Sequence, residues 1–61
     1  MTGDQIAKIL NLTYTGVQKC YREPDIYLFT DPHTKGTFAV KKLDREEVEK
    51  GLNSLRARFG V

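Results

Sequence analysis

Residues 13–22, TYTGVQKCYR, decide the fold, because two properties of this stretch disagree. Its β-branched and aromatic side chains and its glycine favour a strand. Its apolar residues Tyr14, Val17 and Tyr21 instead recur at helical spacing, at i, i+3 and i+7. Neither face of a regular strand through this stretch would be wholly apolar. We weigh spacing above propensity and predict a helix, with a strand as the alternative.

The composition is that of a small folded protein. The 61 residues are 39% hydrophobic and 30% charged, which is atypical of a disordered or low-complexity chain. A chain of this length buries about 60% of its unfolded surface, so we expect one domain, residues 1–61, with a small core. No apolar run approaches the roughly 20 residues of a membrane span. The single cysteine and the lack of a signal-like amino terminus indicate a cytoplasmic protein without a disulfide.

Basic side chains are concentrated in the first two thirds of the sequence, although the net charge is only +2. Residues 1–43 carry six basic residues against four acidic ones, and residues 44–61 carry four of each. Within residues 13–22 the only charges are those of Lys19 and Arg22, which suits a surface that faces phosphates. A net charge this small also fits a protein that is merely well solvated.

The segment before the disputed stretch predicts a short helix. Residues 6–10 place apolar side chains at helical spacing, and Thr2 or Asp4 can cap the start of such a helix. Asn11 tolerates the left-handed conformation with which many helices end. Thr13 can then cap a second helix.

Two strands and a last helix are predicted after the disputed stretch. Residues 26–30, IYLFT, and 37–40, TFAV, are rich in β-branched and aromatic residues, and the turn residues 31–36, DPHTKG, join them. Asp44 can cap a helix that Gly60 ends. The apolar stripe of this helix consists of Val48, Leu52, Leu55 and Phe59.

If the disputed stretch is a helix, residues 6–20 have the pattern of a helix-turn-helix. Ile6, Leu10 and Val17 face the core, and the small Ala7 lets the two helices cross closely. The outward face of the second helix would meet the major groove, where Gln can bond adenine and Lys or Arg can bond guanine or phosphate. That face consists of Thr15, Gln18, Lys19 and Arg22, with Tyr14 at its rim and Thr13 at the helix start.

Three stretches also carry a family resemblance. They are TGDQIAKILNLTYTGVQK (2–19), CYREPDIYLF (20–29) and TFAVKKLDREEVEKGL (37–52). In order and spacing these stretches resemble the excisionase family of small winged helix-turn-helix proteins, relatives of the MerR-type DNA-binding domain. The first resembles the opening motif of that family, the second resembles the passage into the wing, and the third resembles the second wing strand with its following helix. The resemblance implies an α+β fold, a small winged helix-turn-helix of order α-α-β-β-α.

The resemblance also implies a wing and a function. The wing would be residues 31–36, with His33, Thr34 and Lys35 near the minor groove or the flanking phosphates. The function would be sequence-specific binding of double-stranded DNA, as an excisionase-like recombination directionality factor or a small transcription regulator of a mobile element. Gly16 stands where family members usually have Thr or Ser.

The alternative is a non-enzymatic module of order α-β-β-β-α. Residues 13–22 would be its first strand, turned into the second by Glu23-Pro24-Asp25. Its three-stranded sheet would mediate an interaction with protein or would itself lie on DNA. Backbone chemical shifts for residues 14–21 distinguish this module from the helix-turn-helix.

We expect no enzymatic activity, no cofactor and no metal site. The sequence offers no convincing nucleophile or acid/base pair, and Cys20 and His33 lack the spacing of zinc ligands. The last helix extends past the usual end of the family's helix. Its residues Leu55 and Phe59 either only cover the small sheet or extend beyond the core. In the second case they predict self-association or contact with an integrase, since a domain this small gains affinity by binding in pairs or arrays.

Overall fold

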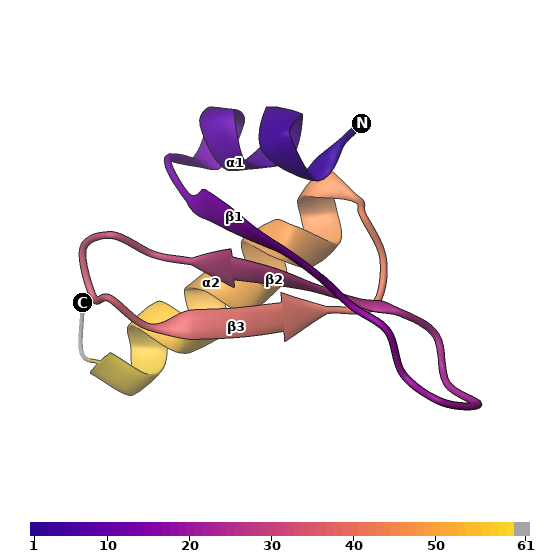
Figure 1. The fold of residues 1–61 in the computed structure, drawn as a ribbon. Helices are drawn as coiled ribbons and strands as arrows, with labels where there is room; N and C mark the ends of the chain where they lie inside the picture. The colour runs from indigo at the N-terminus through magenta and orange to yellow at the C-terminus, as the bar shows by residue number, and fades with distance from the viewer. Residues whose placement is uncertain (60–61) are drawn as a thin grey trace.

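One helix precedes and one helix follows three consecutive strands along the chain, in the order α-β-β-β-α (Figure 1). This computed structural model describes residues 1–59. The strands form one antiparallel sheet in the order β1-β2-β3. In Figure 1, α2 lies behind the sheet, α1 lies beside β1, and no helix of the described residues lies in front of the strands. The elements are α1 (Gly3–Leu10), β1 (Thr13–Gln18), β2 (Ile26–Thr30), β3 (Thr37–Val40) and α2 (Arg45–Phe59).

The predicted winged helix-turn-helix of order α-α-β-β-α is wrong, because residues 13–18 form a strand and not a second helix. β1 pairs with β2 from Thr13 to Gln18. The alternative order, α-β-β-β-α, is the one that the structure has. Its first strand is shorter than predicted and ends at Gln18 instead of continuing to residue 22.

A β-bulge explains why the apolar spacing of β1 looks helical. Tyr14 pairs with Phe29 and Val17 pairs with Tyr27, and the register shifts between Tyr14 and Gly16. Phe29 and Tyr27 are two residues apart and so lie on one face of β2. The bulge adds one residue to β1, which brings Tyr14 and Val17 to that same face although they are three residues apart. A spacing of i, i+3 is therefore compatible with a bulged strand as well as with a helix.

Gly16 has the backbone conformation that this bulge requires. Its φ is +129°, in a region that L-residues rarely adopt, and a Cβ added there would meet nothing within 4 Å. We expect Gly16→Ala to destabilise the protein by about 1–3 kcal/mol through backbone strain alone. Urea unfolding followed by circular dichroism measures this loss.

Chemical synthesis with D-alanine at position 16 provides the matched control for this prediction. D-alanine has the same side chain but favours positive φ, so this analogue should retain most of the stability that Gly16→Ala loses. Equal losses for the two enantiomers would show that the side chain, and not the backbone angle, causes the destabilisation.

The other predicted elements are present, and the core lies between the inner face of the sheet and the two helices. Thr2 and Gln5 form a capping box at the start of α1, and Asn11 ends it with φ of 57°, as expected. Leu52 is buried on the apolar stripe of α2. The predicted stop at Gly60 lies outside the described residues. The central buried cluster is Ile6, Ala7, Phe29, Val40 and Val48.

Candidate nucleic-acid interface

The sheet has one buried face and one face that no helix of the described residues covers. Phe29 is completely buried on the inner side, so its neighbours Leu28 and Thr30 point to the other side. Cross-strand pairing extends this assignment to β1 and β3. We call the outer side the open face; it consists of Thr13, Gly16, Gln18, Ile26, Leu28, Thr30, Thr37 and Ala39.

The open face is uncharged and rich in hydroxyl groups. Thr13 pairs with Thr30 and Thr30 with Thr37, which places three hydroxyl side chains in one row across the sheet. The Oγ1 atoms of Thr30 and Thr37 are 3.0 Å apart and share a hydrogen bond. In the next row, Leu28 pairs with Gly16 and Ala39. The face therefore offers hydroxyl groups, small apolar groups and the Gln18 amide.

Exposed lysines border the open face on the loops that continue its strands. Lys41 follows the buried Val40 in β3, so strand alternation directs it to the open side. Two acids, Asp25 and the exposed Glu23, lie in the β1–β2 hairpin, where Asp25 pairs with Lys19 at 3.2 Å, and Asp31 is buried. The acids around the start of α2 belong to the helix behind the sheet (Figure 1). The exposed lysines at the ends of these strands, called the bordering lysines, are Lys19, Lys35, Lys41 and Lys42.

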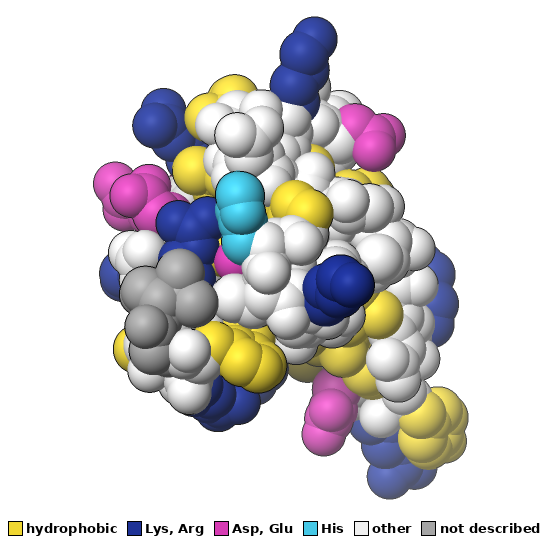
Figure 2. Space-filling view, turned by 90° about the vertical axis from the view of Figure 1, so that its left-hand side faces the viewer, with side chains coloured by type: hydrophobic (Ala, Val, Ile, Leu, Met, Phe, Trp, Pro, Cys, Tyr) yellow, Lys and Arg dark blue, Asp and Glu magenta, His cyan; other side chains and the backbone are white. Residues whose placement is uncertain are grey.

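The hairpin between β1 and β2, residues 19–25, projects beyond the sheet (Figure 1). Tyr21 in this hairpin is 86% exposed, and the guanidinium carbon of Arg22 lies 5.2 Å from the centre of its ring. Figure 2 shows hydrophobic and basic side chains together on this segment, at its lower right. The right side of Figure 2 is the front of Figure 1, so the hairpin leans toward the side of the open face.

The residues predicted for a recognition helix are divided among three environments. Tyr14 faces the core, where its ring centre lies 5.1 Å from that of Phe29, so it is not at an exposed rim. Lys19 and Arg22 lie in the hairpin. The remaining three lie along β1, where Thr15 donates a hydrogen bond to the Leu28 carbonyl at 3.0 Å: Thr13, Thr15 and Gln18.

The predicted wing residues lie in the β2–β3 loop, residues 31–36, at the opposite end of the sheet from the hairpin (Figure 1). His33 and Lys35 are exposed, and the Thr34 hydroxyl accepts a hydrogen bond from the Gly36 amide at 3.2 Å. The loop and the hairpin therefore flank the open face at its two ends instead of forming one patch with a recognition helix.

A buried carboxylate holds the β2–β3 loop in place. Asp31 accepts hydrogen bonds from the His33 amide at 3.1 Å and from Nε of Arg56 in α2 at 3.2 Å. Burial by itself would raise the pKa of the Asp31 carboxyl, but these hydrogen bonds and the charges of Arg56 and His33 lower it below the ordinary value of 3.8. The sequence predicts only a turn residue here, because nothing local links Asp31 to a partner 25 positions away.

Protein-family models, curated proteins and solved structures give no match to this chain. The excisionase resemblance therefore stays a prediction. No helix within residues 1–59 is long and apolar enough to cross a membrane. Within the same residues, no three His, Cys, Asp or Glu side chains are grouped so that they could hold a metal ion.

Proposed function

We propose that the protein binds duplex DNA by placing the open face of its sheet in the major groove. The observation that carries this proposal is the distribution of charge around that face. The face itself is uncharged, lysines border it, and the acids around the start of α2 belong to the helix on the opposite side of the sheet. Such an arrangement lets lysines reach phosphates on both walls of a groove while the centre meets base edges.

The dimensions of the sheet suit the groove. Neighbouring strands lie about 4.8 Å apart, so three strands place their outer backbones about 10 Å apart. The major groove of B-DNA is about 12 Å wide and admits a two-stranded β-ribbon, and β-sheet DNA-binding proteins place their strands in a groove. The absence of large aromatic residues from the open face supports close approach.

The side chains on the open face can read bases. The Gln18 amide can bond adenine in bidentate fashion, and threonine hydroxyls can donate or accept at any base edge. Ala39 and Leu28 offer apolar contact to thymine methyl groups. The narrower role of recombination directionality factor or transcription regulator rests on the sequence resemblance alone.

Removal of two bordering lysines should weaken DNA binding. We expect Lys41→Ala/Lys42→Ala to lower affinity for a random duplex of about 20 base pairs roughly tenfold at 50 mM salt. The slope of log K against log salt should fall by about 2, since two phosphate contacts are lost. Fluorescence anisotropy at 50 and 200 mM salt measures both quantities.

The matched control for the lysine variant removes the same charge from α2. Arg45→Ala/Lys50→Ala changes two exposed residues on the helix behind the sheet, and it should leave the salt slope near that of the unmodified protein. Equal losses for the two double variants would show that net charge alone drives binding. No binding at 50 mM salt would refute the proposal.

A further inference from the structure

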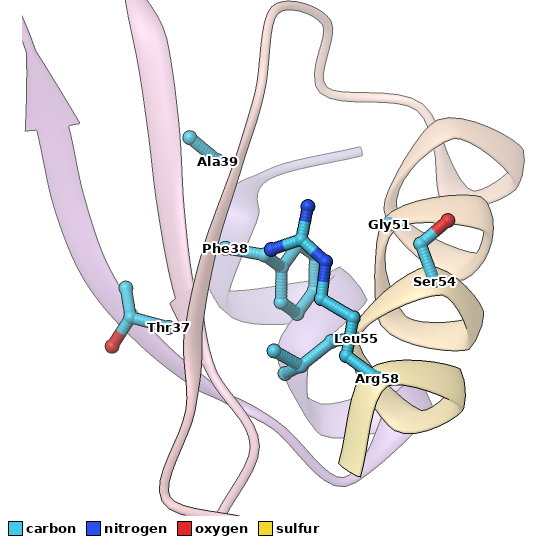
Figure 3. A pocket seen from close by; sticks show the side chains of 7 residues that line it. All are labelled: Thr37, Phe38, Ala39, Gly51, Ser54, Leu55 and Arg58. Carbon is cyan, nitrogen blue, oxygen red and sulfur yellow. The ribbon is translucent and has the colours of Figure 1, made fainter. Parts of the chain in front are cut away.

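A groove runs between the outer edge of the sheet and α2, apart from the open face (Figure 3). It has a volume of about 290 Å³ and is lined by β3 on one side and by the second half of α2 on the other. Phe38 and Leu55 supply apolar surface, and Ser54 and Arg58 supply polar groups. In Figure 3 the Arg58 side chain extends across the groove toward β3.

The outer side of the β3 backbone pairs with no other strand within residues 1–59. Among the described strands, β3 pairs with β2 and lies at the edge of the sheet. The amide of Asp31 donates a hydrogen bond to the Gly36 carbonyl at 2.9 Å, so these two residues form a hydrogen-bonded pair. Hydrogen-bonded and non-hydrogen-bonded pairs alternate along an antiparallel ladder, so the pairs that contain Thr37 and Ala39 are not hydrogen-bonded to β2. The N–H and C=O groups of Thr37 and Ala39 therefore point outward, away from β2.

The edge of β3 lacks the features that usually prevent strand addition. It contains neither proline nor a charged residue, and the side chains of Thr37 and Ala39 point away from the groove in Figure 3. An added strand therefore meets free backbone groups without obstruction from these side chains.

Gly51 sets the width of the groove at one end. A Cβ at this position would lie 2.7 Å from a ring carbon of Phe38, so only glycine lets α2 approach β3 this closely. Glycine within a helix costs about 1 kcal/mol relative to alanine. In this protein the glycine allows a close contact between α2 and β3. The groove opens from this contact toward Arg58.

The charges around the groove select its occupant. Arg58 is the only charged residue among the described residues that line it, and Lys35 and Lys41 flank the two ends of β3. If a second copy paired antiparallel through its own β3, Lys41 of one copy would face Lys35 of the other, and these like charges repel. An extended segment with carboxylates is complementary at both ends and at Arg58.

We propose that this groove binds an extended, acidic peptide segment of a partner protein. The segment adds a fourth strand beside β3, bonds the outward groups of Thr37 and Ala39, and places a carboxylate on Arg58. Main-chain hydrogen bonds give such strand addition its affinity, and side-chain pockets give it specificity. This mode leaves the open face accessible.

The test uses an end-blocked, fluorophore-labelled peptide of about six residues in which Val and Glu alternate, a length that matches a typical strand. Anisotropy should show binding, and amide shifts in ¹⁵N-labelled protein should move at Thr37, Ala39 and Ser54. The same peptide with Lys in place of Glu, and one with N-methyl groups on alternate residues, should each bind at least tenfold more weakly. The full chain is used throughout.

Two variants assign the binding to the groove. Arg58→Glu should weaken the Val/Glu peptide about tenfold, whereas Arg45→Glu, the same change at the other end of α2, should weaken it less than twofold. Ala39→Pro removes one outward N–H at an edge position that tolerates proline, and it should abolish binding. The N-methylated peptide tests the same hydrogen bonds if that variant does not fold.

Several results would overturn the proposal. They are an equal affinity for the Lys peptide, shifts confined to residues outside the groove, no binding of the Val/Glu peptide at millimolar concentration, or a dimer in sedimentation that Ala39→Pro dissociates. The last result would assign the edge of β3 to a second copy of the chain.

Discussion

Phe29→Ala is expected to remove a large share of the stability of the protein at 25 °C. Phe29 is completely buried in the middle strand, with ring centres 5.1 Å from Tyr14 and 5.8 Å from Phe38. Truncating a buried phenylalanine costs about 3–5 kcal/mol, from lost apolar burial and from the cavity that remains. A chain of this length has a total stability of about 3–9 kcal/mol at 0.05–0.15 kcal/mol per residue. One substitution thus removes a large share of the total.

The measurement is urea unfolding followed by circular dichroism, with Phe59→Ala as the control. Phe59 is the same residue type but is 55% exposed at the end of α2, so its truncation should cost about 1 kcal/mol or less. Phe29→Leu, which fills much of the space, should fall between the two. If Phe29→Ala retained nearly full stability, the core would not be centred on this side chain.

Asp31→Asn is expected to lower the free energy of unfolding by about 2–3 kcal/mol. The carboxylate is fully buried, and its partner Arg56 is only 35% exposed, so the substitution leaves a partly buried cation without its counter-charge. The substituted amide side chain retains an oxygen that can accept from the His33 amide, which limits the loss to the ionic contact. Urea unfolding at pH 7 gives the value. The matched control is Asp25→Asn, which breaks an ion pair with the largely exposed Lys19 and should cost under about 1 kcal/mol.

The same carboxylate should make stability depend on pH. The pKa of Asp31 is lowered in the folded protein, so its ionised form is bound more tightly there than in the unfolded chain. Its contribution is present above the unfolded value near pH 4 and is lost as the pH falls through the lower folded pKa. The difference in stability between the unmodified protein and Asp31→Asn should therefore shrink in acid. A difference independent of pH would show that the Asp31 charge is not what stabilises the loop.

Most elements were predictable because their signals are local. Each element is specified by its own residues or by their immediate neighbours. The signals are the caps of α1, the apolar composition of β2 and β3, and the helical stripe of α2. β1 was not predictable from spacing, since its bulge places Tyr14 and Val17 on one face at i, i+3. Its β-branched and aromatic residues favour a strand, and Gly16 disfavours a helix.

The candidate site depended on that one element. With β1 as a helix, Tyr14 was expected at a DNA-facing rim, and with β1 as a strand it packs on Phe29. Lys19 and Arg22 carry the same charges in either fold, so a basic surface was predictable while its shape was not. The Asp31–Arg56 contact and the groove beside β3 depend on tertiary packing, and the sequence carries no local signal for them.

The meander of β1, β2 and β3 also bears on how fast the chain folds. Each strand pairs with its neighbour in sequence, so the sheet closes only short loops and contains no crossover. Loop-closure entropy is therefore small during sheet formation, and α1 and α2 can dock from either end. Folding on the order of milliseconds follows from this topology, without the slow search that parallel or long-range pairing imposes.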